Sequence, residues 1–337
     1  MLDQKPLSKL LFLDIETTSQ KESFFDLTER QQNLFKKRFK KDIESKVTLQ
    51  FAIATSEKQK KEESAIEPPV LKKGTKKKTT PTSSTEEMIQ KITENVCVEL
   101  YNTKAPIHCE FSRVLCISVG VMWKNDGDDF YNIKITSFYD EDEKKILFDF
   151  VNHPKLGVIL DKLPGKFEKN RNEYWAIVGH NISVFDLPVL SKRMIINEIK
   201  PPAMFDVSHL KSWDLTDVVI DTKSAWSYNV FDNSTSLDLL CEIFNVPSSK
   251  DDIDGSEVKN IFWIEKDLPR IVKYCEKDVL ALAQVYLKMK SMPEEVRLFV
   301  QQPAQPYAET PAPGGYAETP APGGYAETTN SVVPSAE

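Results

Sequence analysis

The sequence lacks an excess of positive charge, because 44 lysine and arginine residues stand against 51 aspartate and glutamate residues, for a net charge of −7. This balance excludes a strongly basic protein that binds nucleic acid through its overall field. An acidic chain can still act on nucleic acid, since metal ions at a carboxylate site supply local positive charge. Any contact with a phosphate backbone must then use local basic patches.

The sequence also lacks paired cysteines and metal-binding histidines. Its cysteines form no C-x-x-C pair and lie at positions 97, 109, 116, 241 and 275, and its four histidines have no zinc-ligand spacing. Most of these cysteines lie in apolar runs, which indicates buried free thiols in a reducing compartment. The start, Met-Leu-Asp-Gln-Lys-Pro, lacks the layout of a signal peptide, and no apolar run approaches membrane-spanning length. We therefore expect a cytoplasmic protein that does not contact a membrane.

The hydrophobic pattern predicts a mixed α/β sheet flanked by helices. Apolar or alternating runs predict strands at residues 10–13, 114–123, 130–139, 175–178 and 217–220, the last being the final strand expected. Asp126-Gly-Asp-Asp129 predicts a hairpin between the second and third of these strands. Helical spacing predicts helices at residues 28–45, 86–103, 141–151, 185–197, 236–244, 257–263 and 266–289.

Composition divides the chain into one domain, an insert and a tail. Residues 1–294 have the patterns of a folded domain, whereas residues 55–85 are rich in Lys, Glu, Ser, Thr and Pro and are predicted to be a disordered loop. Residues 295–337 are predicted to be a flexible tail, because a Pro/Gly-rich repeat of nine residues begins at Tyr307 and Tyr316 and starts again at Tyr325. The repeats are interpreted as a tether, with a short motif for a binding partner as the alternative.

The predicted helix at residues 28–45 has an apolar stripe and a basic face. The stripe consists of Leu34, Phe35, Phe39 and Ile43, and the other face holds Lys36, Lys37, Arg38, Lys40 and Lys41. Two interpretations stay open. The basic face is either the solvated side of a packed helix or a patch that contacts phosphates beside an active site.

Asp14 and Glu16 directly follow the apolar run Leu-Leu-Phe-Leu at residues 10–13. Alternate side chains of a strand point to the same face, so the two carboxylates are expected to lie together at the end of a buried strand. Carboxylates placed side by side repel each other unless a cation lies between them. Asp-x-Glu is common by chance, however, and a solvated strand end is the simpler interpretation of this motif taken alone.

Two further motifs supply carboxylates of the same kind. Gly-His-Asn-Ile-Ser-Val-Phe-Asp ends in Asp186 after a predicted strand, although Asn181 or Ser183 could simply cap a helix there. Tyr274 and Asp278 lie four residues apart in a predicted helix and so share one helix face. Four carboxylates and a tyrosine in this order and in these contexts indicate a nuclease site, and oxygen-only ligands suit Mg²⁺ or Mn²⁺.

These motifs resemble the three exonuclease motifs of the DEDDy branch of 3′–5′ exonucleases. The chain is most similar to the predicted 3′–5′ exonucleases related to the proofreading domain of family B DNA polymerases. The similarity includes the stretches at residues 104–120 and 250–256 and covers about residues 8–50 and 95–290. The resemblance implies an RNase H-like exonuclease fold.

The resemblance also implies a role for each motif residue in a site with two ions of Mg²⁺ or Mn²⁺. Asp14 would bridge both ions, Glu16 and Asp278 would complete the shell of the first, and Asp186 would support the second. Tyr274 would orient the attacking water; Lys273 occupies the position at which the sister branch has a histidine base.

For the substrate, Asn181 is expected to contact the terminal nucleotide, and Phe185 to stack on a base or to belong to the core. Thr17 and Thr18 are expected to present backbone groups to the 3′-hydroxyl. The predicted function is metal-dependent 3′–5′ hydrolysis of single-stranded DNA in replication, repair or proofreading beside a separate DNA polymerase or replication protein. An exoribonuclease and a non-catalytic nucleic-acid-binding scaffold are the alternatives.

Overall fold

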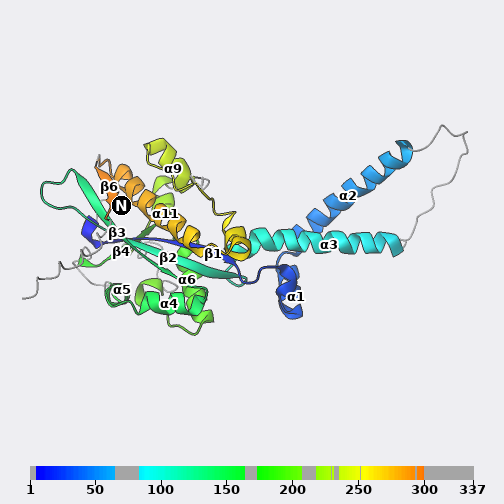
Figure 1. Ribbon diagram of the computed structural model, residues 1–337, viewed down its shortest axis with the longest axis horizontal. Coiled ribbons are helices and arrows are strands. Elements are labelled where there is room, and N and C mark those ends of the chain that lie inside the picture. Colours follow the sequence, from blue (N-terminus) through cyan, green and yellow to red (C-terminus); the bar gives the residue numbers. More distant parts are fainter. Residues whose placement is uncertain are drawn as a thin grey trace, which may run out of the picture. The chain divides into compact units, whose positions relative to one another are not determined.

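The structure is a computed structural model that describes residues 5–64, 83–163, 173–206, 218–228, 230, 235–250, 252–292 and 294–299. Its centre is a six-stranded sheet in the order β5-β4-β1-β2-β3-β6 (Figure 1). The strands are β1 (Leu10–Ser19), β2 (Ser112–Trp123), β3 (Phe130–Tyr139), β4 (Ala176–Gly179), β5 (Val219–Asp221) and β6 (Glu295–Leu298). This arrangement confirms the predicted mixed sheet flanked by helices.

Strand β1 lies inside the sheet, where the parallel and the antiparallel parts of the sheet meet. It pairs antiparallel with β2 and parallel with β4, and β5 extends the parallel side. Strand β3 pairs antiparallel with β2 through the predicted hairpin. Leu10, Leu11, Phe12 and Leu13 are all buried, since helices cover both faces of the sheet at this strand.

One face of the sheet packs against the long helix α11 (Leu268–Met289), and the other packs against α4 (Glu143–Val151) and α6 (Asp186–Ile196), with α5 (Leu156–Leu160) nearby (Figure 1). The residues of β1 alternate between these layers. Leu10 and Phe12 belong to the cluster under α11, whereas Leu11 and Leu13 belong to the larger cluster on the opposite face. Side chains at even positions of β1 therefore face α11.

A small residue allows α11 to lie close to the sheet. A Cβ atom added at Gly120 of β2 would be 2.8 Å from Val279 Cγ1 and 2.7 Å from Ile133 Cδ1. The helix itself begins at the N-cap Asp267, whose side chain accepts a hydrogen bond from the Arg270 amide. The N-cap thus marks where α11 begins, and Gly120 leaves room for Val279 of this helix against β2.

The segment after β1 differs from its prediction. Instead of one helix at residues 28–45, α1 (Glu29–Arg38) and α2 (Lys40–Ser64) meet at Phe39. Phe35, Phe39 and Ile43 are buried against α3 (Ser83–Lys104), but Leu34 is 52% exposed and lies outside the apolar stripe. Helix α2 extends ten residues into the predicted disordered loop and α3 begins within it, while residues 65–82 lie outside the described residues.

The end of the sheet domain is also placed differently. Strand β6 pairs parallel with β3 and carries Arg297, so the folded domain continues past the boundary that the sequence predicts at residue 294. Four residues after a proline give too short a pattern to predict a strand. The repeats from Tyr307 onward lie outside the described residues.

The remaining predicted elements are present with small shifts. Strand β5 begins at Val219, and residue 217 lies outside the described residues. The predicted helix at 257–263 is α10 (Val258–Asn260) followed by the π-helical turn η7 (Ile261–Glu265). The other elements are α8 (Thr222–Trp226), α9 (Leu237–Phe244), η2 (Leu7–Lys9), η3 (Phe24–Asp26), η4 (Ala105–Ile107) and η6 (Ala203–Phe205).

The cysteines and the helices are both subjects of expectations from composition. All five cysteines are buried and free, as predicted. Within the described ranges, none of the helices combines the length and the apolar character needed to span a membrane.

Candidate active site

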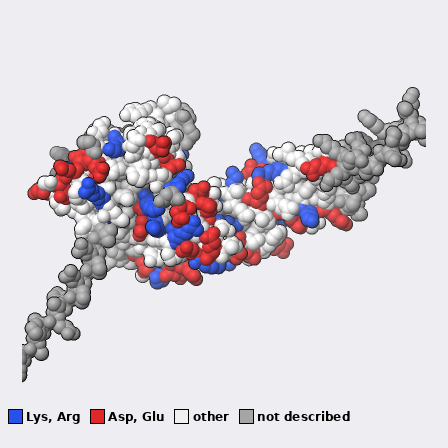
Figure 2. Space-filling view, turned by 45° about the horizontal axis from the view of Figure 1, so that its top comes forward, with Lys and Arg blue, Asp and Glu red and all other residues white. Residues whose placement is uncertain are grey.

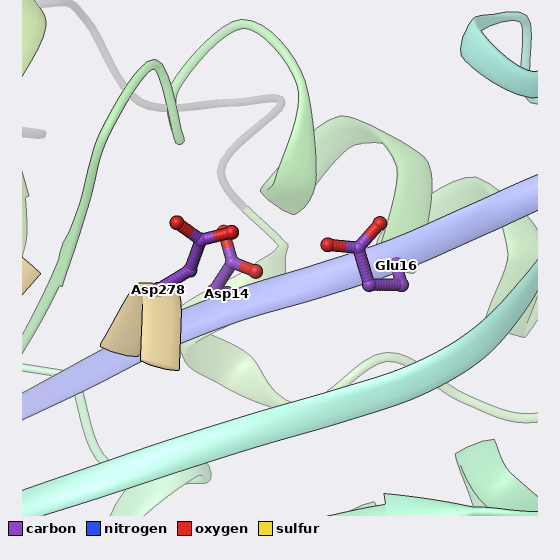
Figure 3. A group of neighbouring side chains, drawn as sticks. All are labelled: Asp14, Glu16 and Asp278. Carbon is purple, nitrogen blue, oxygen red and sulfur yellow. The ribbon is translucent and has the colours of Figure 1, made fainter. Parts of the chain in front are cut away.

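Asp14 and Glu16 lie on the α11 face of β1, at even positions that follow Leu10 and Phe12. Asp278 approaches them from α11, and Figure 3 shows the three carboxylates directed toward one another from the strand and the helix. One oxygen from each carboxylate lies within 4.8 Å of the other two. The structure therefore brings together residues that are more than 260 positions apart in the sequence.

A β-bulge lies at the carboxylate end of β1. Glu16 pairs with Cys116 of β2, but Thr17 pairs with Val114, so Leu115 is an extra residue on β2. Bulges change the twist of a strand and redirect the side chains beside it, and they are frequent next to active sites. Here the bulge follows the last of the β1 carboxylates.

Tyr274 lies one turn before Asp278 on the same face of α11, as the sequence predicts. Its ring is buried in the cluster that contains Leu115, Ile253 and Phe262. Burial, and then the negative charge of Asp278, raise the pKa of the Tyr274 hydroxyl well above its usual value. The hydroxyl therefore stays protonated, and its hydrogen bond to Asp278 lowers the pKa of that carboxyl.

Asp186 is the first residue of α6 and is buried beside the three carboxylates rather than among them. Burial raises its pKa to about 7, against hydrogen bonds from its own amide and from the Ile15 amide, which lower it. Its charge in turn raises the pKa values of Asp14 and Glu16. Asp186 is thus close enough to interact electrostatically with both β1 carboxylates.

The site strongly disfavours its own negative charge. Burial first, and then repulsion from Asp278 and neighbouring acids, raise the pKa values of Asp14 and Glu16 well above their usual range. Among the described residues, no lysine or arginine forms an ion pair with Asp14, Glu16 or Asp278. A divalent cation would relieve this repulsion, and a set of carboxylate oxygens fits Mg²⁺ or Mn²⁺.

Ser249 belongs to the site although its sequence context gave no sign of this. Its hydroxyl donates a hydrogen bond to Asp278 Oδ1 at 2.6 Å. The neighbouring Lys250 also lowers the pKa of Asp278, although burial raises that pKa overall. The segment is anchored by Arg270, whose Nε and Nη2 donate to the two carboxylate oxygens of Asp252 at 3.0 Å each. Ser249 and Asp252 thus connect the loop before α10 to α11, at Asp278 and Arg270 respectively.

Asp221 is a second residue that the sequence did not reveal. It caps α8 and also accepts hydrogen bonds from the amides of Asn181 at 3.0 Å and Ser183 at 3.1 Å. Asn181 has a left-handed backbone, with φ of 65°. One carboxylate therefore fixes the loop that leads from β4 to Asp186, and its charge contributes to the raised pKa of Asp186.

The predicted substrate-contacting residues have different surroundings in the structure. Thr17 donates its hydroxyl to the Pro106 carbonyl at 2.8 Å. Thr18 is fully buried, and its hydroxyl oxygen has no hydrogen-bond partner among the described residues. Phe185 is half-buried and packs against the main core cluster, which gives it a structural role whatever else it does.

On the face of the described residues that Figure 2 shows, basic and acidic side chains are interspersed rather than separated into large areas of one sign. On this face, contact with a polyanion would accordingly be local.

Residues 107–302 match the family described as predicted 3′–5′ exonuclease related to the exonuclease domain of PolB. No curated protein matches the chain. The family match covers more than half of the sequence and includes Asp186, Tyr274 and Asp278, whereas Asp14 and Glu16 precede it. The chain belongs to this family of predicted exonucleases, and the fold adds the two β1 carboxylates to the residues that the match contains.

Proposed function

We propose that this member of the exonuclease family hydrolyses single-stranded DNA from its 3′ end with the help of bound divalent metal ions. The observation that carries the proposal is the group formed by Asp14, Glu16 and Asp278, three carboxylates within 4.8 Å with which no lysine or arginine of the described residues forms an ion pair. Burying such a group is unfavourable unless a cation compensates it. The family match supports nuclease chemistry in general, and Asp278 lies within the matched residues.

Asp14, Glu16 and Asp278 would hold Mg²⁺ or Mn²⁺, with Asp186 beside them as a ligand for a second ion. Bound ions of this kind make water a better nucleophile and neutralise charge that develops on a phosphodiester. Tyr274 keeps its proton because of its raised pKa, so it can donate a hydrogen bond and orient an attacking water. Ser249 positions Asp278 through its 2.6 Å hydrogen bond.

The substrate contacts form a further part of the proposal. Asn181 lies on the loop that Asp221 fixes before Asp186, and we assign to it the polar contact with the terminal nucleotide. Stacking on Phe185 would be tolerant of base sequence, as a non-specific exonuclease requires. The backbone of Thr17 and Thr18 follows the carboxylates on β1 and is assigned to the 3′-hydroxyl.

The basic residues at the junction of α1 and α2 are candidates for contact with the phosphate backbone. Lys36, Lys37, Arg38, Lys40 and Lys41 are all exposed. Lys40 forms a surface ion pair with Glu44 at 3.7 Å, a weak interaction that a phosphate can displace. A role in proofreading or repair beside a separate polymerase is proposed from the family's relation to the PolB exonuclease domain.

An assay with single-stranded DNA and RNA of equal sequence, each labelled at the 5′ end, tests the proposal. We expect a ladder of progressively shorter labelled products from DNA with Mg²⁺ or Mn²⁺ and no products in EDTA. Asp14→Asn serves as the inactive control. Degradation that persists in EDTA, or immediate release of a labelled mononucleotide, would contradict the proposal, and faster loss of RNA would assign the activity to an exoribonuclease.

A further inference from the structure

The sheet carries a hollow on the face opposite to Asp14 and Glu16. It has a volume of about 530 Å³ and is lined by β2, β3, the connection between α4 and α5, α5 itself, and the residue that precedes β4. Val119, Val121 and Trp123 of β2 point into it. These odd positions alternate with Ser118 and Gly120, which lie on the α11 face. We call this hollow the far-face groove.

The far-face groove combines two indole rings with positive charge. Trp123 and Trp175 contribute the rings, and Lys134 and Lys155 contribute exposed ammonium groups. Among the residues that the structure describes, no aspartate or glutamate lines the groove, and neither lysine forms an ion pair. This composition is unusual on a chain whose net charge is −7. It favours a ligand that is anionic and also presents flat, stackable rings.

An adjoining hollow extends the groove along the sheet. It shares Ile159 and Trp175 with the far-face groove and contains Lys9, whose Nζ lies 5.7 Å from the centroid of the Trp175 ring. The adjoining hollow also holds acidic residues, so the positive part of the surface is the far-face groove itself. At the opposite end, Trp123 packs edge-to-face with Phe299, with ring centroids 5.3 Å apart.

We propose that the far-face groove binds a short segment of single-stranded nucleic acid, with bases on Trp123 and Trp175 and phosphates near Lys134 and Lys155. Aromatic stacking together with cationic side chains is the general way in which proteins hold single strands without sequence preference. The choice of nucleic acid as the ligand rests on the proposed exonuclease function. The groove is an accessory site, because the sheet separates it from Asp14 and Glu16.

An accessory site on the other face of the sheet affects long and short substrates differently. A strand of a few nucleotides reaches only the catalytic site, whereas a longer strand can occupy both sites and gain effective concentration from the second. Loss of the groove should therefore raise the KM for long strands and leave the rate on very short ones unchanged.

Binding of fluorescent oligo-dT to the full chain in EDTA tests the proposal without cleavage. We expect Lys134→Gln combined with Lys155→Gln to raise Kd by about tenfold and to lower the slope of log K against log salt by about 1.4, since each phosphate contact on a single strand contributes about 0.7. The matched control is Lys144→Gln combined with Lys192→Gln, which removes the same charge from exposed positions on α4 and α6. Equal Kd values and slopes for the two double variants would overturn the proposal.

Photocrosslinking gives a readout that does not depend on how a variant folds. Oligo-dT that carries 5-iodouracil should crosslink to Trp123 or Trp175 of the unmodified protein, as identified by peptide mass spectrometry. Crosslinks confined to peptides outside the groove would contradict the assignment. A protein that binds through the groove but cleaves nothing would refute the exonuclease proposal alone, whereas one that cleaves DNA but binds independently of the groove would refute only this inference.

Discussion

Carboxylates that are buried or half-buried against this sheet lie in two opposite electrostatic settings. Glu143 is neutralised by the protein, because Arg193 donates to both of its oxygens and the Val114 amide and the Asn197 side chain complete its hydrogen bonds. Asp14, Glu16 and Asp278 receive no such cation from the described residues. Both groups lie against the same sheet, so burial alone does not identify a functional site. The two settings differ in that Glu143 has an arginine partner, whereas Asp14, Glu16 and Asp278 form no ion pair with a described lysine or arginine.

The largest effect on the exonuclease rate is expected when one of the three carboxylates without an ion pair, Asp14, Glu16 or Asp278, is altered. Asp14→Asn should lower the exonuclease rate by at least about 1000-fold, because the proposed function makes Asp14 a ligand of the metal ion that would contact the reacting phosphate. The variant should also melt at the same or a higher temperature than the unaltered protein without metal, since one source of repulsion is removed. Single-turnover rates and metal-free thermal melts measure the two effects, and a variant that melts much lower would show that Asp14 is structural.

At Glu143, whose charge Arg193 neutralises, we expect the opposite: a large loss of stability and little change in rate. Arg193→Met leaves Glu143 buried without its partner and should reduce the free energy of unfolding by about 3–5 kcal/mol. Urea denaturation measures this loss, and the rate per folded molecule should change little. Glu143→Met combined with Arg193→Met is the control, because removing both charges should restore part of the stability. A loss below about 1 kcal/mol for Arg193→Met would mean that the pair resembles a surface ion pair.

Tyr274→Phe separates orientation of water from binding of metal. We expect the rate to fall by about 10- to 1000-fold, because the variant loses the hydrogen bond that we propose orients the attacking water. The Mn²⁺ affinity should stay nearly the same, because the carboxylates remain and the ring keeps its packing with Leu115 and Phe262. Unchanged activity would remove Tyr274 from the mechanism.

The smallest expected effect is on the way the melting temperature depends on pH. Asp186 has a folded-state pKa of about 7, raised from 3.8, so it stabilises the fold below about pH 4 and this contribution is lost as the pH rises to 7. Metal-free melting temperatures should therefore fall across this range by a few °C more in the unaltered protein than in Asp186→Asn. Saturating Mg²⁺ should reduce the difference, and identical pH profiles for the two proteins in EDTA would contradict the raised pKa.

The sequence predicts those features that depend on local pattern. Alternating apolar residues predict β2 and β3, and the four-residue spacing of Tyr274 and Asp278 predicts that they share one face of α11. Both predictions hold because the strand and helix periods determine side-chain direction. Asp221 and Ser249 could not be predicted, since each acts through a partner at least 29 residues away in the chain. β6 was missed because four residues carry too weak a pattern, and the far-face groove is formed by separate elements that only the fold brings together.

Calorimetric titration of Mn²⁺ into the metal-free protein tests the central claim most directly, since the claim is that uncompensated carboxylates make this site a metal centre. The unaltered protein and Arg193→Met, compared at a temperature where both are folded, should bind Mn²⁺ alike. Asp14→Asn and Asp278→Asn should each lose this binding. Equal Mn²⁺ binding by the unaltered protein and Asp14→Asn, or no binding by the unaltered protein, would contradict the account.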